Sequence, residues 1–393
     1  MAVGDIYKLK LETITSSGDA LGRIDGKLVF VEGGAPDETV HCRITEERKT
    51  WNRAQLLEVI EPSPARVKPK CAFYGKCGGC NLQHLNYETQ LDIKKSILKD
   101  SFLRIGGFEP PRIEVFPSPP WEYRNRMQFH CLRQKAKADN IGFGLKEKTS
   151  ENIITVSECP IAAPCINDLL KGKIFPLPPE KDRFTVFSKD DLLLSESTLQ
   201  RGNIKLLDKE IIVDAGVFFQ SNCSMLEKLI LELQKITDTH NKIDKTLPMA
   251  DFYCGVGTFA AFLAEKFPFV ILAEENKTAV SLARENLKGI KHEIFALRDT
   301  DWQKNLLNKN NMLEKQNIGF AVLDPPRAGL NFKLALSLAQ NDITVIAYVS
   351  CDPASLARDS KILVNGGYNL EKLMFFDFYP QTSHIESLAI FSK

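Results

Sequence analysis

The chain has 393 residues, with 51 Lys and Arg against 50 Asp and Glu and an apolar content of 44%. This length allows two or three domains with their own cores, and the composition lacks the high net charge and low apolar content of disordered chains. No stretch approaches the roughly 20 apolar residues of a membrane span, and residues 1–10 lack a signal-peptide core. We therefore expect a soluble, cytoplasmic protein whose ten cysteines serve metal binding or catalysis rather than disulfides.

The first part of the chain, residues 1–62, is predicted to be all-β. Three short segments rich in aliphatic and β-branched residues are strand candidates, at residues 28–31, 39–44 and 56–60. Several strands at such close spacing favour a small closed barrel of the oligonucleotide-binding (OB) type. A Pro-Ser-Pro run that begins at Pro62 then marks a linker.

Residues 63–216 are predicted to form a second, α+β domain with a helix at residues 87–104 and a local excess of positive charge. From residue 61 to residue 148 the chain has 16 Lys and Arg against 9 Asp and Glu. Basic and aromatic side chains alternate at residues 123–129, and a second basic run follows at 133–137. This arrangement suits phosphate contact combined with base stacking, and a solvated charged face is the alternative.

Three closely spaced cysteines, Cys71, Cys77 and Cys80, share this domain with two neighbouring glycines. The run is too compact for unrelated thiols, and a fourth ligand could be either Cys159 or Cys165. Four thiolates suit zinc or an iron–sulfur cluster equally well. The sequence therefore predicts a metal site, and its spacing alone leaves both metals open.

From residue 217 to residue 393 apolar strands alternate with helical stretches. The strand candidates lie at residues 249–253, 270–273, 320–323 and 343–349. Such an alternation predicts an α/β domain with a mostly parallel, doubly wound, Rossmann-like sheet.

A glycine loop follows the first of these strands. Gly255 and Gly257 let the backbone approach a ligand closely, and Glu274, nineteen residues after Gly255, can bind ribose hydroxyls at the end of the next strand. This pattern alone does not separate a nicotinamide cofactor from S-adenosylmethionine. The Asp-Pro-Pro-Arg run that begins at Asp324 is typical of nucleic-acid methyltransferases and favours S-adenosylmethionine.

A cysteine and a glutamate near the end of the chain form a candidate catalytic pair. Cys351 follows the last apolar strand in a Ser-Cys-Asp-Pro turn, and Glu386 ends a Gln-Thr-Ser-His-Ile-Glu run. Open α/β sheets bind ligands at the carboxyl ends of their strands. The pair would supply a soft nucleophile and a general base. The alternative is that Cys351 is a small buried hydrophobic residue.

Taken in chain order, these motifs resemble those of the RNA (uracil-5-)-methyltransferase family, and specifically its iron–sulfur branch acting on large-subunit (23S) ribosomal RNA. The matching motifs are the cysteine run with Asn81-Leu82-Gln83-His84, Phe218-Phe219-Gln220-Ser221-Asn222, the glycine loop, the Asp-Pro-Pro-Arg strand end, the Ser-Cys-Asp-Pro turn and the closing Gln-Thr-Ser-His-Ile-Glu. The resemblance runs nearly from end to end.

The resemblance implies three domains. Residues 1–62 would be a TRAM domain, which is an OB-like RNA-binding barrel, and residues 63–216 a central α+β iron–sulfur domain. Residues 217–393 would be a Rossmann-like class I methyltransferase domain. In relatives the helix near residues 93–119 packs with the catalytic domain, so the resemblance also implies that this domain is discontinuous.

The same resemblance assigns ligands. It implies a [4Fe-4S] cluster on Cys71, Cys77, Cys80 and Cys159. It places contacts to S-adenosylmethionine on six residues, namely Gln220, Tyr253, Thr258, Glu274, Asp299 and Asp324. Thr258 departs from the asparagine that is frequent in the family, and the loop before Asp299 is shortened.

The expected chemistry follows from the reactivity of uracil, whose C5 is a poor nucleophile. Addition of the Cys351 thiolate to C6 creates an enolate, and C5 can then displace the methyl group of the cofactor. Glu386 would remove the C5 proton, which allows elimination of Cys351. The target base must leave its stack to be reached, and His384 is expected to orient the hairpin.

Two other classes of protein remain as alternatives. An iron–sulfur RNA-binding protein without activity would lack the catalytic pair, whereas Cys351 and Glu386 are both present. A nicotinamide-dependent iron–sulfur oxidoreductase is disfavoured by the Asp-Pro-Pro-Arg strand end. We expect a monomer that acts on RNA and not at a membrane. Neither the target uridine nor the choice between ribosomal and transfer RNA follows from the sequence.

Overall fold

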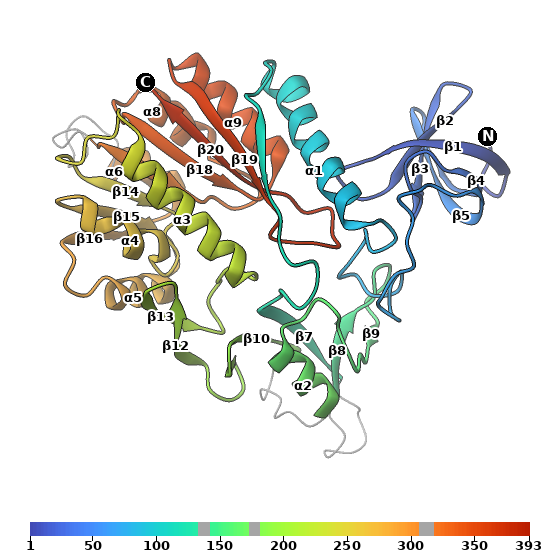
Figure 1. The fold of residues 1–393 in the computed structure, drawn as a ribbon, viewed down its shortest axis with the longest axis horizontal. Coiled ribbons are helices and arrows are strands. Elements are labelled where there is room, and N and C mark those ends of the chain that lie inside the picture. The colour runs from blue at the N-terminus through green and yellow to red at the C-terminus, as the bar shows by residue number, and fades with distance from the viewer. Residues whose placement is uncertain (133–141, 173–180, 306–317) are drawn as a thin grey trace.

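The computed structural model describes residues 1–132, 142–172, 181–305 and 318–393. Within these ranges the chain forms a closed five-stranded barrel, a five-stranded sheet, a two-stranded ribbon and an eight-stranded sheet. Figure 1 shows the barrel at one end of the molecule, with the large sheet at the other end and the smaller sheet below and between them. The second basic run, at residues 133–137, lies outside the described residues.

The N-terminal barrel confirms the predicted all-β start. Its strands are β1 (Ile6–Ile14), β2 (Ala20–Ile24), β3 (Lys27–Glu32), β4 (Thr39–Glu47) and β5 (Trp51–Glu61). The order is β1-β2-β3-β5-β4, and β4 pairs back with β1. Leu9 and Leu11 point into the barrel while the lysines beside them face outward, as strand alternation requires. Closure leaves no strand edge unpaired.

The central sheet has the order β11-β10-β7-β8-β9. Its strands are β7 (Arg126–Leu132), β8 (Gly142–Lys146), β9 (Ile153–Ile154), β10 (Arg183–Lys189) and β11 (Leu192–Ser195), with helix α2 (Pro164–Gly172) against β10 and β11. Three aromatic rings, of Phe129, Phe143 and Phe184, pack together in its core at 5.2 to 5.8 Å. A ribbon of β12 (Arg201–Leu206) and β13 (Lys209–Asp214) follows.

The eight-stranded sheet has the order β16-β15-β14-β17-β18-β20-β19-β6. Its strands are β16 (His292–Ala296), β15 (Val270–Glu274), β14 (Met249–Phe252), β17 (Phe320–Leu323), β18 (Val345–Ser350), β20 (Glu386–Ser392), β19 (Asn369–Phe376) and β6 (Ile113–Phe116). The strands from β14 to β18 are parallel, and β20 runs antiparallel to β18 and β19. The order reverses between β14 and β17, which creates the switch point where such sheets bind ligands. The predicted doubly wound sheet is confirmed.

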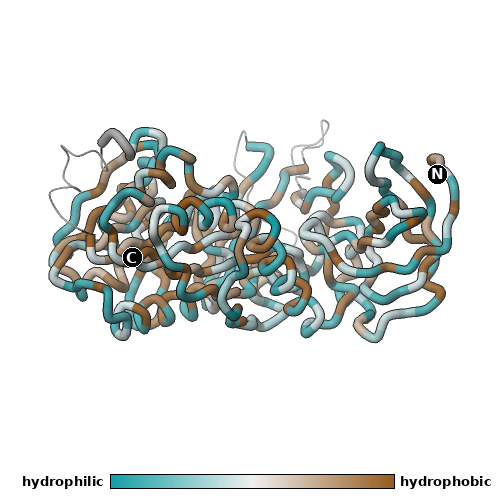
Figure 2. The backbone as a smooth tube through the Cα atoms, turned by 90° about the horizontal axis from the view of Figure 1, so that it is seen from above, coloured by the Kyte–Doolittle hydropathy of each residue, from teal (hydrophilic) through white to brown (hydrophobic). Residues whose placement is uncertain are grey.

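Helices cover both faces of this sheet. One face carries α3 (Cys223–Thr239), α4 (Thr258–Leu263) with its short extension η2 (Ala264–Lys266), and α5 (Lys277–Asn286). The other face carries α1 (Tyr87–Ser101), α6 (Asp299–Asn305), α8 (Phe332–Gln340) and α9 (Pro353–Asn365). In Figure 2, seen from above, this layered body and the N-terminal barrel occupy opposite ends of the molecule.

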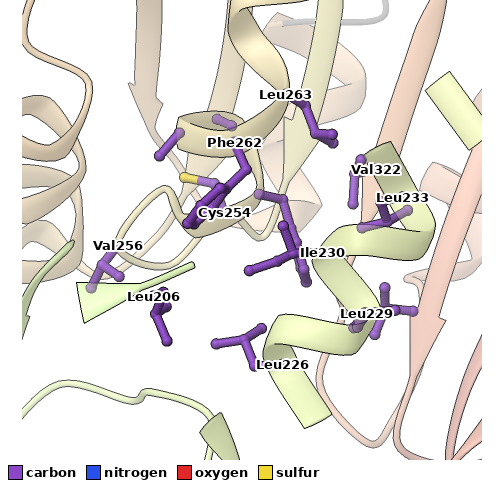
Figure 3. Packing of buried hydrophobic residues seen from close by; sticks show 14 of the residues in the cluster. Leu206, Leu226, Leu229, Ile230, Leu233, Cys254, Val256, Phe262, Leu263 and Val322 are labelled. Atoms are coloured by element: carbon purple, nitrogen blue, oxygen red, sulfur yellow. The ribbon is translucent and has the colours of Figure 1, made fainter. Parts of the chain in front are cut away.

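Helix α3 shows how the sequence builds one of these layers. Its buried side chains recur every three or four residues, and they include Leu226, Leu229, Ile230 and Leu233. Figure 3 shows this stripe facing Phe262 of α4 and Val322 of β17. Each such side chain, when fully buried, contributes roughly 1.5–3 kcal/mol. An amphipathic stripe of this kind holds a helix on a sheet.

Helix α1 and strand β6 join the large sheet from a distant part of the sequence. The Asn86 side chain caps α1 by accepting a hydrogen bond from the Thr89 backbone. The helix continues into a π-helical turn, η1 (Phe102–Gly106), which packs on α9. Strand β6 pairs in parallel with β19, so this segment packs against the large sheet, as the resemblance implied. The domain boundaries at residues 62 and 216 stay predictions.

Throughout the parts of the chain that the structure describes, none of the helices has the length and apolar character of a membrane span.

Candidate active site and cysteine pocket

A pocket of about 760 Å³ opens at the carboxyl ends of the central strands of the large sheet. All eight residues predicted for the cofactor and for catalysis line it, namely Gln220, Tyr253, Thr258, Glu274, Asp299, Asp324, Cys351 and Glu386. They come from seven separate places in the chain. The pocket lies at the switch point of the sheet, where doubly wound folds hold their ligands.

The glycine loop forms the floor of the pocket. Tyr253, Gly255 and Gly257 all have left-handed backbones, with φ of 60°, 53° and 80°. A Cβ on Gly257 would lie 3.2 Å from the Ala283 side chain of α5, so this glycine permits close packing of the loop. The Gly255 backbone N–H donates to Glu274 Oε2 at 3.0 Å, which fixes the carboxylate at the end of β15.

Some of the polar side chains that were predicted to contact the cofactor also contact one another. The Tyr253 hydroxyl donates to Asp299 Oδ2 at 3.3 Å, and Gln220 Nε2 lies 3.4 Å from Asp324 Oδ2. Burial raises the pKa of Asp324 to about 7, Glu274 adds repulsion, and the Gln220 hydrogen bond opposes the shift. Among the described residues, Gln220 Oε1 has no hydrogen-bond partner. The pocket therefore offers acceptors suited to hydroxyls and amines.

Cys351 and Glu386 face the same pocket from neighbouring strands. Cys351 follows β18, and the Asp352 side chain caps α9 by accepting from the Ser355 backbone at 2.7 Å. Burial, together with the nearby Glu386 and Asp324 charges, raises the pKa of the Cys351 thiol to about 12. Arg327 acts in the opposite direction. The thiol keeps its proton in the ligand-free protein.

Glu386 is the first residue of β20 and is 3% exposed. Burial raises the pKa of its carboxyl group well above the usual range, Asp324 adds repulsion, and Arg327 again opposes the shift. Within the described part of the chain, Glu386 Oε1 has no hydrogen-bond partner. Buried polar atoms are normally paired, so this oxygen is available to a group that enters the pocket.

His384 and Arg327 contact each other at the mouth of the pocket. The Arg327 guanidinium lies 3.2 Å from His384 Nδ1. Burial, together with the positive charges of Arg327 and Arg124, lowers the pKa of His384 to about 4. A neutral imidazole at neutral pH agrees with the expectation that His384 orients the hairpin.

Several residues of the pocket were not predicted as site residues. They are Arg124, Arg126, Arg327 and Tyr379. Arg327 is the last residue of the Asp-Pro-Pro-Arg run, and this position in the sequence was the feature that could have identified it. The Arg126 guanidinium lies 5.7 Å from the centre of the exposed Phe218 ring, which places one part of the basic and aromatic run of residues 123–129 at the pocket.

The four cysteines predicted as metal ligands line a second pocket of about 390 Å³. Burial raises the pKa of Cys77, raises that of Cys80 to about 12 and raises that of Cys159 to about 11. Neighbouring thiols of the set contribute to each shift, Cys71 among them. Cys165 lies elsewhere, with its Sγ 3.1 Å from the Asp190 carbonyl oxygen.

The closeness of these four thiols does not by itself show that they bind a metal. Across the described residues, no group of three or more His, Cys, Asp or Glu side chains stands in an arrangement that could hold a metal ion. The donor set nevertheless fits a thiolate-bound centre in its chemistry, because the four thiols surround one cavity and influence one another's ionisation. The cluster therefore stays a prediction.

The fold and the first pocket define a class of protein. A doubly wound sheet with acidic strand ends, a glycine loop and an Asp-Pro-Pro-Arg segment around one switch-point pocket is the arrangement of an S-adenosylmethionine-dependent methyltransferase.

Comparison with known proteins agrees with this class and narrows it. The family model of tRNA (Uracil-5-)-methyltransferase matches residues 188–393, and that of the TRAM domain matches residues 2–57. An uncharacterized RNA methyltransferase of Treponema denticola is 34% identical, covering 94% of each chain. The 23S rRNA (uracil(1939)-C(5))-methyltransferase RlmD of Marinomonas sp. is 30% identical, covering 100% of this chain and 96% of its own.

A solved structure shows the same fold along the whole chain. It is the tRNA (uracil-54, C5)-methyltransferase of Pyrococcus abyssi in complex with S-adenosyl-L-homocysteine, with a TM-score of 0.73 and 24% identity, covering 98% of this chain and 100% of that one. The chain belongs to the tRNA (Uracil-5-)-methyltransferase family, and the protein is an S-adenosylmethionine-dependent RNA (uracil-5-)-methyltransferase.

Proposed function

We propose that this enzyme forms 5-methyluridine in 23S ribosomal RNA, with Cys351 as the nucleophile and Glu386 as the general base. The single observation that carries the mechanism is that both side chains line one pocket together with the six residues predicted to contact the cofactor. A base that enters this pocket meets a thiol and a carboxylate on one side and the methyl donor on the other.

The cofactor half of the pocket suits a nucleoside with a charged methionine tail. Glu274 accepts backbone hydrogen bonds from Gly255 and, at 2.8 Å, from Asn276, so its carboxylate is oriented before a ribose arrives. Asp324 lies close enough to Cys351 and Glu386 for its charge to raise the pKa of both, and Gln220 contacts Asp324 at 3.4 Å. The sulfonium carries a positive charge, which favours the ionised forms of the partly buried Asp324 carboxyl and the buried Glu386 carboxyl.

The first chemical step is the addition of the Cys351 sulfur to C6 of uracil. The reacting species is the thiolate, and burial holds the pKa of Cys351 at about 12 in the free enzyme. Arg327 is the group on the pocket wall that favours ionisation of both Cys351 and Glu386. We assign to Arg327 the role of stabilising these two negative charges when the site is filled.

After methyl transfer, C5 carries both the new methyl group and a proton. Glu386 accepts this proton, the C5=C6 double bond re-forms, and the sulfur of Cys351 leaves. The raised pKa of Glu386 makes its ionised form a stronger base than an exposed carboxylate. The Oε1 atom of Glu386, which has no hydrogen-bond partner among the described residues, supports this role.

Four thiols around one cavity support a [4Fe-4S] cluster on Cys71, Cys77, Cys80 and Cys159. When bound, the cluster would serve as a structural cross-link between the cysteine loop and the segment before α2. Zinc is the alternative with the same donor set. The thiols lie in a pocket separate from that of Cys351, so no step of the methyl transfer passes through them.

Ribosomal RNA is the proposed target because the full-length RlmD relative at 30% identity carries that activity in its name. Transfer RNA is the second candidate, since the structural match is named for a tRNA uridine. The TRAM barrel and the pocket arginines Arg124 and Arg126 suit either RNA.

The target is tested with RNA from a strain that lacks the gene. The enzyme and a labelled methyl donor are added to isolated 23S ribosomal RNA and, separately, to bulk transfer RNA. We expect label in 23S RNA at the uridine that corresponds to position 1939 of the relatives. Label in transfer RNA alone would show that the second candidate is correct.

A further inference from the structure

The loop before Glu386 has a constrained backbone. Gln381, five residues earlier, has a left-handed φ of 67° and is 3% exposed. A non-glycine residue keeps this conformation only when its surroundings determine it. The Gln381 backbone N–H donates to Gln90 Oε1 at 2.9 Å, and its carbonyl oxygen accepts from the Asn81 and Leu82 N–H groups at 3.1 and 3.0 Å.

Gln90 is a buried side chain of α1 that connects two loops. Its Nε2 donates to Gln381 Oε1 at 3.1 Å, and it also lies 3.2 Å from the Leu82 carbonyl oxygen and 2.9 Å from that of Leu85. Its exposed fraction is 0%. One amide therefore joins the end of the cysteine loop to the loop that leads to Glu386.

Asn81 directly follows Cys80 and contacts Ser383, in the loop from Gln381 to Glu386 (the Glu386 loop). Its Oδ1 accepts from the Ser383 backbone at 2.9 Å, and its Nδ2 lies 3.1 Å from Ser383 Oγ and 2.8 Å from the Ser17 carbonyl oxygen. Gly18 of the barrel is packed so closely that a Cβ there would lie 2.3 Å from Asn81 Nδ2. The barrel, the cysteine loop and the Glu386 loop therefore meet at this side chain.

We propose that Asn81 and Gln90 are positioning residues for Glu386. Neither side chain lines the active-site pocket, so both act through Gln381 and Ser383. The contact of Asn81 with Ser17 also makes the barrel part of this arrangement. The proposal rests on the role of Glu386 as the base, and it concerns the orientation of that base.

The arrangement predicts an effect on one chemical step. Cys351 is held from a different direction, by β18 and by the Asp352 cap of α9. Loss of the Asn81 contacts therefore leaves addition of Cys351 and methyl transfer in place. Removal of the C5 proton, which needs Glu386 in position, becomes slow.

Asn81→Ala is the primary test. We expect kcat to fall by about 10- to 100-fold, because a misplacement of about 1 Å away from the chemistry has an effect of this order. The ratio kcat/KM for S-adenosylmethionine should stay nearly unchanged, so that KM falls together with kcat, because the slowed step follows methyl transfer. A methylated RNA–enzyme adduct should accumulate during turnover and survive denaturing electrophoresis. Asn81→Asp keeps the acceptor for the Ser383 backbone and should restore part of the rate.

Asn86→Ala is the matched control. It removes the N-cap of α1 through a side chain that accepts from Thr89 and does not touch Gln381 or Ser383. We expect a lower midpoint of thermal unfolding without adduct. Gln90→Met, which keeps the length of the side chain but none of its hydrogen bonds, should repeat the result of Asn81→Ala.

A folded Asn81→Ala enzyme that turns over at the wild-type rate, or that loses activity without forming adduct, overturns the proposal. Glu386→Gln distinguishes this failure from a failure of the proposed function. If Glu386→Gln accumulates adduct and Asn81→Ala does not, only the positioning role is wrong. If Glu386→Gln itself turns over normally, the assignment of the base is wrong.

Discussion

Cys351 directly follows β18 and Glu386 begins β20, which are neighbouring antiparallel strands of one sheet. Ser350, the last residue of β18, pairs with Ser387 of β20, so the next pair of positions in the ladder is Cys351 and Glu386. The proposed nucleophile and the proposed base are thus placed by strand register, which is strongly specified wherever one face of a sheet is buried.

The roles of Cys351 and Glu386 can be distinguished by the covalent RNA–enzyme adduct, because Cys351 is needed to form it and Glu386 is needed to resolve it. Cys351→Ala should abolish turnover and form no adduct, because nothing adds to C6. Glu386→Gln should allow addition and methyl transfer and then stall, so a labelled RNA–enzyme adduct should persist in denaturing electrophoresis. An unstable Glu386→Gln protein without adduct would mean that Glu386 serves the fold rather than the reaction.

The pH dependence of the reaction should follow the buried pair. Since burial raises the pKa of both Cys351 and Glu386, their reactive ionised forms increase as pH rises. We expect the single-turnover rate to increase from about pH 6 to about pH 9. Arg327 lowers both pKa values, so Arg327→Met should move the profile to higher pH and Arg327→Lys should move it less. A profile that moves to lower pH in Arg327→Met would contradict this assignment.

Cofactor affinity should depend on Glu274. Its carboxylate ends β15 inside the pocket and is oriented by Gly255 and Asn276. Glu274→Ala should weaken S-adenosylmethionine binding by on the order of 2–3 kcal/mol in calorimetry, the scale of hydrogen bonds to a charged group. RNA affinity should stay nearly unchanged, and Glu293→Ala on the neighbouring strand should change neither. An equal loss of both affinities would point to damage of the fold.

The metal prediction is tested by purification without oxygen. If the four thiols hold a cubane cluster, the protein should be brown and contain about four irons per chain. Cys77→Ala should lose iron and should have weaker RNA binding or lower solubility. Cys165→Ala should keep its iron, because the Cys165 thiol lies outside the cysteine pocket. Stoichiometric zinc without iron would show that the cluster assignment is wrong.

Local sequence patterns predicted the parts of the fold that local chemistry determines. The apolar run at residues 320–323 and the glycines after β14 have few alternatives to a buried strand and a tight turn, and both were found there. Strand β16 (His292–Ala296) was missed because its residues are only partly buried and include His292 and Glu293. Its place is set by pairing with β15.

The same distinction between local and long-range determinants applies to the residues of the site. Motif positions predicted which side chains line the pocket, and the structure brings all eight together. The choice between Cys159 and Cys165 could not be made from spacing, because it depends on which thiol the fold turns inward. Gln90 carried no sequence signal of the proposed role, and Asn81 was marked only as part of the cysteine-run motif, because their partners lie about three hundred residues away.

Strand β6 has a consequence for how the protein can be made and divided. It completes the sheet edge beside β19, and Lys94 of the preceding helix forms a fully buried ion pair with Asp377, at 2.6 Å. A fragment that begins at residue 217 would expose the edge of β19 and leave a buried carboxylate without its cation. Both defects favour aggregation. During synthesis, residues 87–116 emerge first and must wait for β19, so the large sheet can be completed at this edge only after residues 369–376 have been made.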